Sequence, residues 1–86
     1  MRLVFTSQGW DDYRYWRQCD RTVLKRVNRL LDEAMRHPTG GIGKPEPLKY
    51  GIGGAWSRRI TEEQRLVYVV VDGDLVVLQA RYHYGT

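Results

Sequence analysis

The segment 20–37 constrains the fold most, because its apolar residues recur at a spacing that an α-helix places along one side. Counted from the first of them, they stand at i, i+1, i+4, i+7, i+8 and i+11: Val23, Leu24, Val27, Leu30, Leu31 and Ala34. Asp20 is suited to cap the start of this helix, and Pro38 to stop it after His37. The segment is therefore predicted to be an amphipathic helix.

A shorter helix is predicted before it, over residues 8–18. Its aromatic residues recur every three positions, which aligns them along one side: Trp10, Tyr13 and Trp16. Residues 2–5 form a short apolar stretch that suits a strand, and Thr6-Ser7 can cap the helix that follows. The first part of the chain is thus a strand followed by two helices.

The remainder reads as β-structure after an irregular, glycine- and proline-rich stretch at 39–54. Strands are predicted at 55–60, 65–71 and 75–84, and Asp72-Gly73 is a strong hairpin signal. We expect an α+β fold with two N-terminal helices packed on one face of a four-stranded antiparallel sheet. Residues 2–5 supply the fourth strand.

Size and composition exclude several classes of function and of location. The 86 residues suit a single domain, 1–86, and Cys19 is the only cysteine, which excludes an intrachain disulfide and argues against a cysteine–histidine zinc site. A net charge of +4 favours a polyanionic partner such as nucleic acid. The longest apolar run, 66–71, is far too short to span a membrane, and the N-terminus leaves no room for a signal peptide. A soluble cytoplasmic protein is expected.

Strand alternation sorts the polar residues of the last strand. Gln79, Arg81 and His83 are predicted to share one face, opposed to Leu78, Ala80 and Tyr82. If the helices cover the apolar face, the other face can hold a basic cleft beside the loop at 39–54. Arg58 and Arg59 are neighbours in a strand, so at most one joins this cleft and the other is a surface charge.

Four side chains in the loop at 39–54 and the strands that follow it suit acid–base chemistry on a phosphate. Glu46 is held between Pro45 and Pro47, which gives a carboxylate the fixed direction that a general base needs. His83 suits a general acid, because histidine exchanges protons near neutral pH. Arg65 can stabilise charge, and the phenol of Tyr84 can stack on a base or donate a hydrogen bond. Each also has a plainer interpretation as an exposed polar side chain, which for Glu46, Arg65 and His83 carries more weight on sequence alone.

Together these residue types suit metal-free cleavage of RNA. The 2′-hydroxyl attacks the adjacent phosphorus, a carboxylate removes its proton, and an imidazolium protonates the departing 5′-oxygen. Arginine and lysine stabilise the charge on the phosphate. This chemistry needs neither a metal nor a cofactor.

Four motifs, in the same order, resemble the YoeB toxins of the RelE/YoeB group of bacterial toxin–antitoxin systems. They are Gly43-Lys44-Pro45-Glu46-Pro47-Leu48-Lys49, Trp56-Ser57-Arg58-Arg59-Ile60, Arg65-Leu66-Val67-Tyr68 and Arg81-Tyr82-His83-Tyr84. The segment Trp10-Asp11-Asp12-Tyr13 is similar as well. The chain departs from the family's pattern by continuing to Gly85-Thr86 after the usual terminal tyrosine, and at Gln64 and Ala80.

The resemblance implies a RelE-like microbial RNase fold and a ribosome-dependent endoribonuclease that cleaves mRNA in the ribosomal A site and inhibits translation. It implies Glu46 as general base, His83 as general acid, Arg65 as the phosphate-stabilising arginine and Tyr84 as a substrate-positioning residue. Basic residues in contact with RNA phosphate are implied at Lys49 and Arg59, and we add Lys44 of the same motif. The implied partners are mRNA, the ribosome and a cognate YefM/Phd-like antitoxin, with operator DNA bound only together with that antitoxin.

Two alternatives remain open at this point. The chain could be a non-catalytic nucleic-acid-binding module that acts with its antitoxin in operator repression. It could also be an interaction protein in which Trp10 and Trp16 form the surface of a homodimer.

Overall fold

The two helices begin at the caps that the sequence predicts. In the computed structural model, which describes residues 1–49 and 51–83, α1 (Ser7–Cys19) follows Thr6, whose hydroxyl accepts a hydrogen bond from the Gly9 amide at 3.0 Å. The carboxylate of Asp20 accepts hydrogen bonds from two amides in the first turn of α2 (Arg21–Arg36). Neither helix is long and apolar enough to cross a membrane, in the part of the chain that the structure describes.

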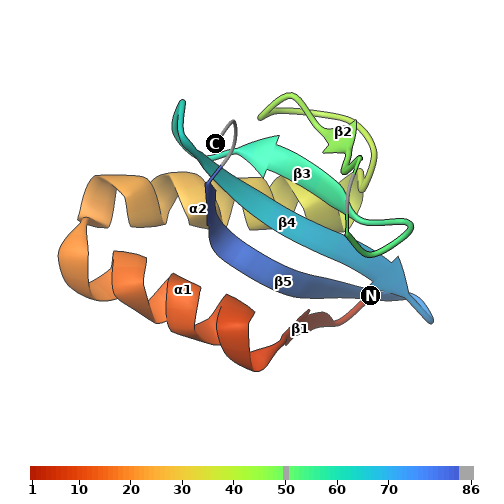
Figure 1. Ribbon diagram of the computed structural model, residues 1–86, viewed down its shortest axis with the longest axis horizontal. Helices are drawn as coiled ribbons and strands as arrows, with labels where there is room; N and C mark the ends of the chain where they lie inside the picture. Colours follow the sequence, from red (N-terminus) through yellow and green to blue (C-terminus); the bar gives the residue numbers. More distant parts are fainter. Residues whose placement is uncertain (50, 84–86) are drawn as a thin grey trace.

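The strands form one mixed sheet rather than the four-stranded antiparallel sheet that the sequence predicts. They are β1 (Leu3–Phe5), β2 (Glu46–Pro47), β3 (Trp56–Arg59), β4 (Gln64–Val71) and β5 (Asp74–His83), and the order across the sheet is β1-β5-β4-β3-β2 (Figure 1). The pairs β2–β3, β3–β4 and β4–β5 are antiparallel. The α+β class and the two helices on one face are as predicted.

Two features account for the difference. β1 pairs with β5 in parallel, with Leu3 opposite Leu75, and the two helices and three strands between them supply the long connection that a parallel pair needs. β2 is a fifth strand of only two residues, too short for any pattern of alternation to reveal. Pro47 is tolerated there because β2 lies at the edge of the sheet, where its missing N–H need not pair with a further strand.

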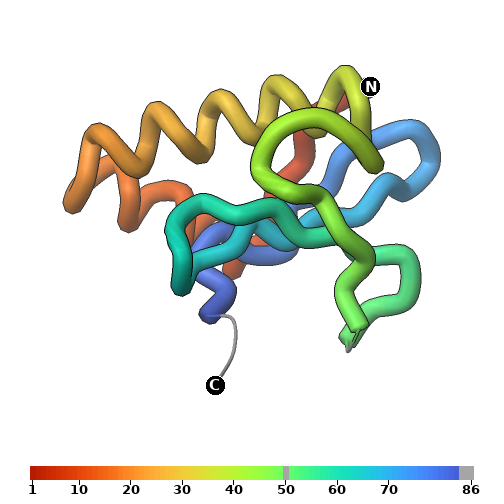
Figure 2. The backbone as a smooth tube through the Cα atoms, turned by 90° about the horizontal axis from the view of Figure 1, so that it is seen from above, coloured from red at the N-terminus to blue at the C-terminus, as the bar shows by residue number. Residues whose placement is uncertain are grey.

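The hydrophobic core lies between the helices and the sheet. α2 contributes four buried residues, Val27, Leu30, Leu31 and Ala34, and the strands contribute Leu66, Tyr68, Leu75, Val77 and Ala80. Figure 2 shows α2 on one side of the strands and the loop after β2, in green, on the other. The sheet therefore has a helix-covered face and an open face.

Candidate functional site

Two rows of directly opposed residues cross the open face of the sheet. One row contains Glu46 on β2, Ser57 on β3, Val67 on β4 and Gln79 on β5; the next contains Arg59, Arg65 and Tyr82. Opposed residues share a face, and the two rows are two residues apart along β3 and β4. The intervening Arg58 and Leu66 are fully buried toward the helices. The pairing thus gathers a carboxylate and two guanidinium groups on one surface.

Arg65 is held beneath this surface rather than exposed on it. Only 2% of the residue is accessible, so the plainer sequence interpretation of an exposed arginine is wrong. Its Nη1 donates to the carbonyl oxygens of Thr61 and Glu62, at 2.9 and 3.0 Å, in the turn between β3 and β4. That turn is closed by the Gln64 amide, which donates to the Thr61 hydroxyl at 3.0 Å. The turn between β3 and β4 therefore orients the Arg65 guanidinium, and Gln64, the first residue of β4, closes that turn.

Arg59 is exposed and lies directly opposite Arg65. Its amide donates to the Gly43 carbonyl at 2.7 Å, and its own carbonyl accepts a hydrogen bond from Arg26 at 3.2 Å. Opposed side chains in an antiparallel pair have Cβ atoms about 4.5–5.5 Å apart. The pairing thus brings two guanidinium groups to neighbouring strands, and two positive charges on one surface favour an anion near them.

Glu46 is exposed, and the chain on either side of it is hydrogen-bonded to β3 or to the residue just before β3. Before it, Gly43 accepts the hydrogen bond from Arg59; after it, the Leu48 amide donates to the Ala55 carbonyl at 2.9 Å. Lys44 is exposed and adopts a left-handed backbone conformation, with φ of 51°. Lys49 is exposed at the other end of the segment. The segment thus presents one carboxylate flanked by two lysines.

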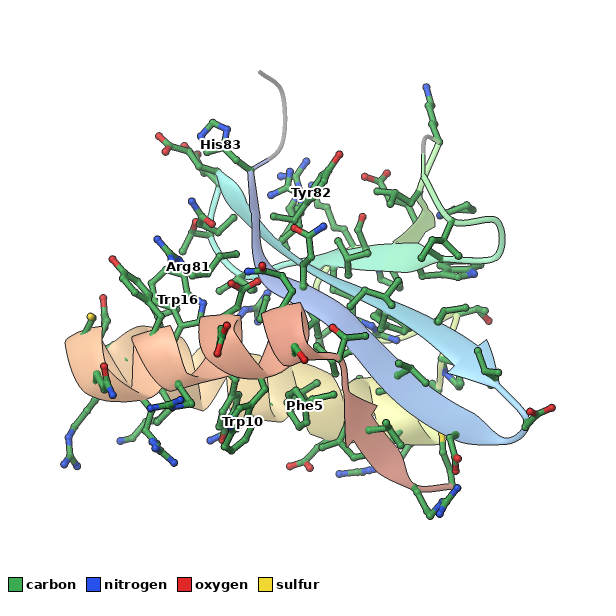
Figure 3. All side chains as sticks on the ribbon, turned by 60° about the horizontal axis from the view of Figure 1, so that its bottom comes forward. Phe5, Trp10, Trp16, Arg81, Tyr82 and His83 are labelled. Carbon is green, nitrogen blue, oxygen red and sulfur yellow. The ribbon has the colours of Figure 1, made fainter. Side chains whose placement is uncertain are left out.

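His83 lies at the end of β5, apart from the two rows. It is opposed to Gln64, and its Nε2 is 3.6 Å from a carboxylate oxygen of Glu63. Figure 3 shows Tyr82 and His83 projecting in different directions from the end of β5. The structure thus places His83 one residue beyond the pair of Arg65 and Tyr82, beside the turn that holds Arg65. The predicted site residue Tyr84 lies outside the described residues.

The face assignments predicted for β5 are wrong. The pairing of β4 with β5 shifts register between Arg65 and Val67 and again between Val67 and Tyr68, which disturbs the simple alternation. Gln79 and its neighbour Leu78 consequently line the same cavity on the open face. Arg81 turns instead to α1, where its guanidinium carbon lies 3.5 Å from the centroid of the Tyr15 ring (Figure 3).

A cavity of about 330 Å³ opens on this face over part of the two rows. One side is formed by the segment after β2 and the other by β5, over a floor on β4: Leu48, Gly51, Ile52 and Ala55, then Leu78, Gln79 and Tyr82, with Val67 beneath. Except for Gln79, the lining is made of aliphatic groups, a glycine and one phenol ring. The irregular segment therefore completes a pocket over the sheet.

On the helix-covered face, Arg58 is fully buried, which the sequence interpretation as a surface charge missed. Its guanidinium donates to the Tyr68 hydroxyl at 2.9 Å, to the Ile42 carbonyl at 2.8 Å and to the His37 carbonyl. The Tyr68 hydroxyl donates in turn to the Pro38 carbonyl. Burial raises the pKa of Tyr68, and the hydrogen bond and charge of Arg58 oppose that shift. This network ties residues 37–42 to the sheet. Most of its acceptors are backbone carbonyls, so no sequence motif predicts that Arg58 is buried.

The aromatic residues of α1 have different environments. Trp16 is buried and its Nε1 donates to the Ala80 carbonyl at 2.7 Å, so it cannot form part of a dimer surface together with Trp10. Trp10 is 41% exposed and stacks on Tyr13 beside Phe5 (Figure 3). Of the two tryptophans proposed for an interaction surface, only Trp10 is accessible.

Comparison with known proteins gives full-length matches. Residues 5–84 match the family model of the YoeB-like toxins of bacterial type II toxin–antitoxin systems. The chain is 56% identical over 84 residues to Toxin YoeB of Streptomyces coelicolor and 50% identical over 84 residues to that of Escherichia coli K12. In each case the match covers 98% of this chain and 100% of the relative.

Solved structures agree with these matches. A YoeB/ParE toxin from Agrobacterium tumefaciens superposes with a TM-score of 0.91 at 49% identity, covering 98% of this chain and 100% of that one. A YoeB dimer and a heterotetrameric YoeB–YefM toxin–antitoxin complex, both from Staphylococcus aureus, give TM-scores of 0.90 and 0.86. Each is 41% identical, and each match covers 98% of both chains.

Proposed function

The chain belongs to the YoeB-like toxins of bacterial type II toxin–antitoxin systems, and from this premise we propose that it is a ribosome-dependent endoribonuclease that cleaves mRNA in the ribosomal A site. The observation that carries the proposal is the open face of the sheet, where Glu46, Arg59 and Arg65 stand in two adjacent rows. A carboxylate beside two guanidinium groups suits proton removal at a phosphodiester.

The proposed reaction is an internal phosphoryl transfer. Glu46 removes the proton of the RNA 2′-hydroxyl, and the 2′-oxygen forms a bond to the adjacent phosphorus. The bond from phosphorus to the 5′-oxygen breaks, and His83 donates the proton that this oxygen takes up. The products are a 2′,3′-cyclic phosphate and a 5′-hydroxyl. Proton transfers of this kind contribute about 10²–10⁴-fold each.

The basic residues stabilise the charge that develops on the phosphate. Arg65 acts from beneath the surface, where lower effective dielectric strengthens its field. Arg59, Lys44 and Lys49 are exposed and suit direct contact with phosphate oxygens. Tyr84, which lies outside the described residues, is proposed to position the substrate.

The ribosome supplies the alignment that so small a site lacks. His83 stands at the end of β5 and Glu46 on a two-residue strand at the edge of the sheet, so the RNA must be held across the sheet for both to act. Holding a reactant in register with catalytic groups can lower a barrier by up to about 7–11 kcal/mol. We therefore expect weak cleavage of free RNA and much faster cleavage on the ribosome in the cytoplasm.

We further propose that the partner that restrains the activity is an antitoxin of the YefM type. The support is the solved YoeB–YefM complex, which matches this chain over nearly its full length. The solved YoeB dimer likewise supports a homodimer. Binding to operator DNA is proposed only for the complex with antitoxin.

The decisive experiment compares four variants at equal expression. Glu46→Ala and His83→Gln should relieve growth arrest and reduce cleavage of ribosome-bound mRNA about 10²–10⁴-fold each. The matched controls are Asp32→Ala, an exposed acidic residue of α2, and His37→Gln, the other histidine; both should stay toxic. Toxicity of Glu46→Ala and His83→Gln equal to that of the parent would refute the mechanism and favour the alternative of an operator-binding module.

The pH dependence is an independent check. A general base and a general acid acting in one step give a bell-shaped dependence of cleavage rate on pH. Under single-turnover conditions on the ribosome, the acid limb should disappear with Glu46→Ala and the alkaline limb with His83→Gln. A flat single-turnover profile across neutral pH in the parent would contradict the assignment.

A further inference from the structure

The cavity on the open face lies beside the proposed cleavage site, and among the residues that the structure describes its lining includes none of those proposed for catalysis or phosphate binding. Its floor, Val67, belongs to the row that begins at Glu46, and Tyr82 in its wall is directly opposite Arg65. Neighbouring strands are about 4.8 Å apart, so this wall lies one strand from Arg65. A group held in the cavity would thus be next to a phosphate bound by Arg59 and Arg65.

We propose that this cavity holds one unstacked nucleobase of the RNA, adjacent to the phosphate that is cleaved. This inference rests on the function proposed above. Proteins that read single-stranded RNA stack its bases on aromatic side chains and bind their edges by hydrogen bonds. The cavity offers the phenol ring of Tyr82, aliphatic walls from Ile52 and Leu78, and one amide, Gln79.

Size and charge favour a base over a segment of a protein partner. A volume of about 330 Å³ is at the lower limit of ligand pockets, which suits one planar group and not a helix. The positive charges of Arg59 and Arg65 beside it match a phosphate carried on the same nucleotide. An apolar side chain from an antitoxin would fill the cavity without using those charges.

Gln79 is the residue that would read the base. Its amide carries both a donor and an acceptor, whereas a glutamate at this position carries acceptors alone. Gln79→Glu should therefore shift preference toward bases that present an amino group to the cavity. Gln18→Glu, the same substitution on the exposed surface of α1, is the matched control. Leu78→Phe tests the cavity in another way, by filling it.

Binding can be measured without cleavage. The probes are 2′-fluoro tetranucleotides, which lack the attacking hydroxyl, and the readout is the NMR shift of the methyl groups of Leu48, Ile52 and Leu78 in the full-length protein. Replacing one nucleotide of the tetramer by an abasic unit should weaken binding about 5- to 100-fold at a single position. Methyl signals that stay unmoved while the Arg59 amide shifts would show phosphate binding alone and overturn the inference.

Cleavage on the ribosome gives the second readout. On a library of mRNA codons, Gln79→Glu should change the base preference at one position relative to the scissile bond, whereas Gln18→Glu keeps the parent's pattern. An unchanged pattern together with weaker antitoxin binding in Gln79→Glu and Leu78→Phe would assign the cavity to the antitoxin and overturn the inference. A parent that binds the tetranucleotides through these methyl groups but cleaves no mRNA would refute the proposed function and leave the base site standing.

Discussion

Removing one hydroxyl group, in Tyr68→Phe, should destabilise the protein strongly. The Tyr68 hydroxyl is fully buried, accepts a hydrogen bond from Arg58 Nε at 2.9 Å and donates to the Pro38 carbonyl. Phenylalanine keeps the ring and leaves both of these groups without that partner. A buried polar group that loses its partner costs about 1–3 kcal/mol, and more if it is charged.

The expected loss is therefore about 2–4 kcal/mol of the free energy of unfolding, which is a large part of the 5–15 kcal/mol typical of native proteins. Equilibrium unfolding in urea at fixed protein concentration measures it, and the denaturant slope should stay unchanged. The matched control is Tyr15→Phe, a tyrosine that is 37% exposed on α1 and should change stability by less than about 0.5 kcal/mol.

A double-mutant cycle measures the energy of the hydrogen bond between Arg58 and Tyr68 separately from the packing of the Tyr68 ring. Arg58→Met removes the donor that Tyr68→Phe leaves without an acceptor, so the two changes together should cost less than their sum, by about 0.5–3 kcal/mol. A loss below about 0.5 kcal/mol for Tyr68→Phe, or strict additivity in the cycle, would refute the reasoning that these groups satisfy one another.

Three further predictions follow from buried or paired groups. Asp12 is 4% exposed and accepts a hydrogen bond from the Ala80 amide at 2.9 Å, so Asp12→Ala should lower the free energy of unfolding in urea by about 1–3 kcal/mol. The hydrogen bond from Arg2 lowers the pKa of Asp74. The stability that this pair contributes is therefore present above about pH 4 and lost as the pH falls below that value. The difference in stability between the parent and Asp74→Asn should accordingly shrink in thermal melts at acid pH. Burial raises the pKa of Tyr68, so stability should decline above about pH 10, by a component absent from Tyr68→Phe.

The local elements were predictable because local signals determine them. The caps at Thr6 and Asp20 and the helical spacing of α2 are properties of neighbouring residues, and the ends of β3 and β5 lie within a residue or two of the prediction. The direction of β1 was not predictable, because it depends on a pairing more than 70 residues away, with Leu3 opposite Leu75. The same holds for β2, whose two residues carry no periodicity.

For the candidate site, the sequence nominates residues, and its geometry could not be predicted. The alternation of side chains between the two faces fails along β5 because its register shifts against β4. No pattern of residues in the sequence predicts those shifts. Arg58 and Arg65 were expected at the surface because long charged side chains are rarely buried. Their acceptors are the Tyr68 hydroxyl and backbone carbonyls such as those of Ile42 and Thr61. Because every residue has a backbone carbonyl, such acceptors cannot be predicted from the sequence.

The position of Glu46 depends on its flanks more than on its own contacts. It lies exposed on the shortest strand, at the edge of the sheet, where two residue pairs with β3 alone would hold it weakly. The chain before it is fixed twice, by Arg58 at Ile42 and by the Arg59 amide at Gly43; the chain after it is fixed by Leu48 at Ala55. Since Pro45 and Pro47 also restrict the backbone between these anchors, the backbone of Glu46 keeps its position while the side chain remains open to solvent. For the general base that we propose, which would meet RNA held on the ribosome, this combination of fixed backbone and free side chain is suitable.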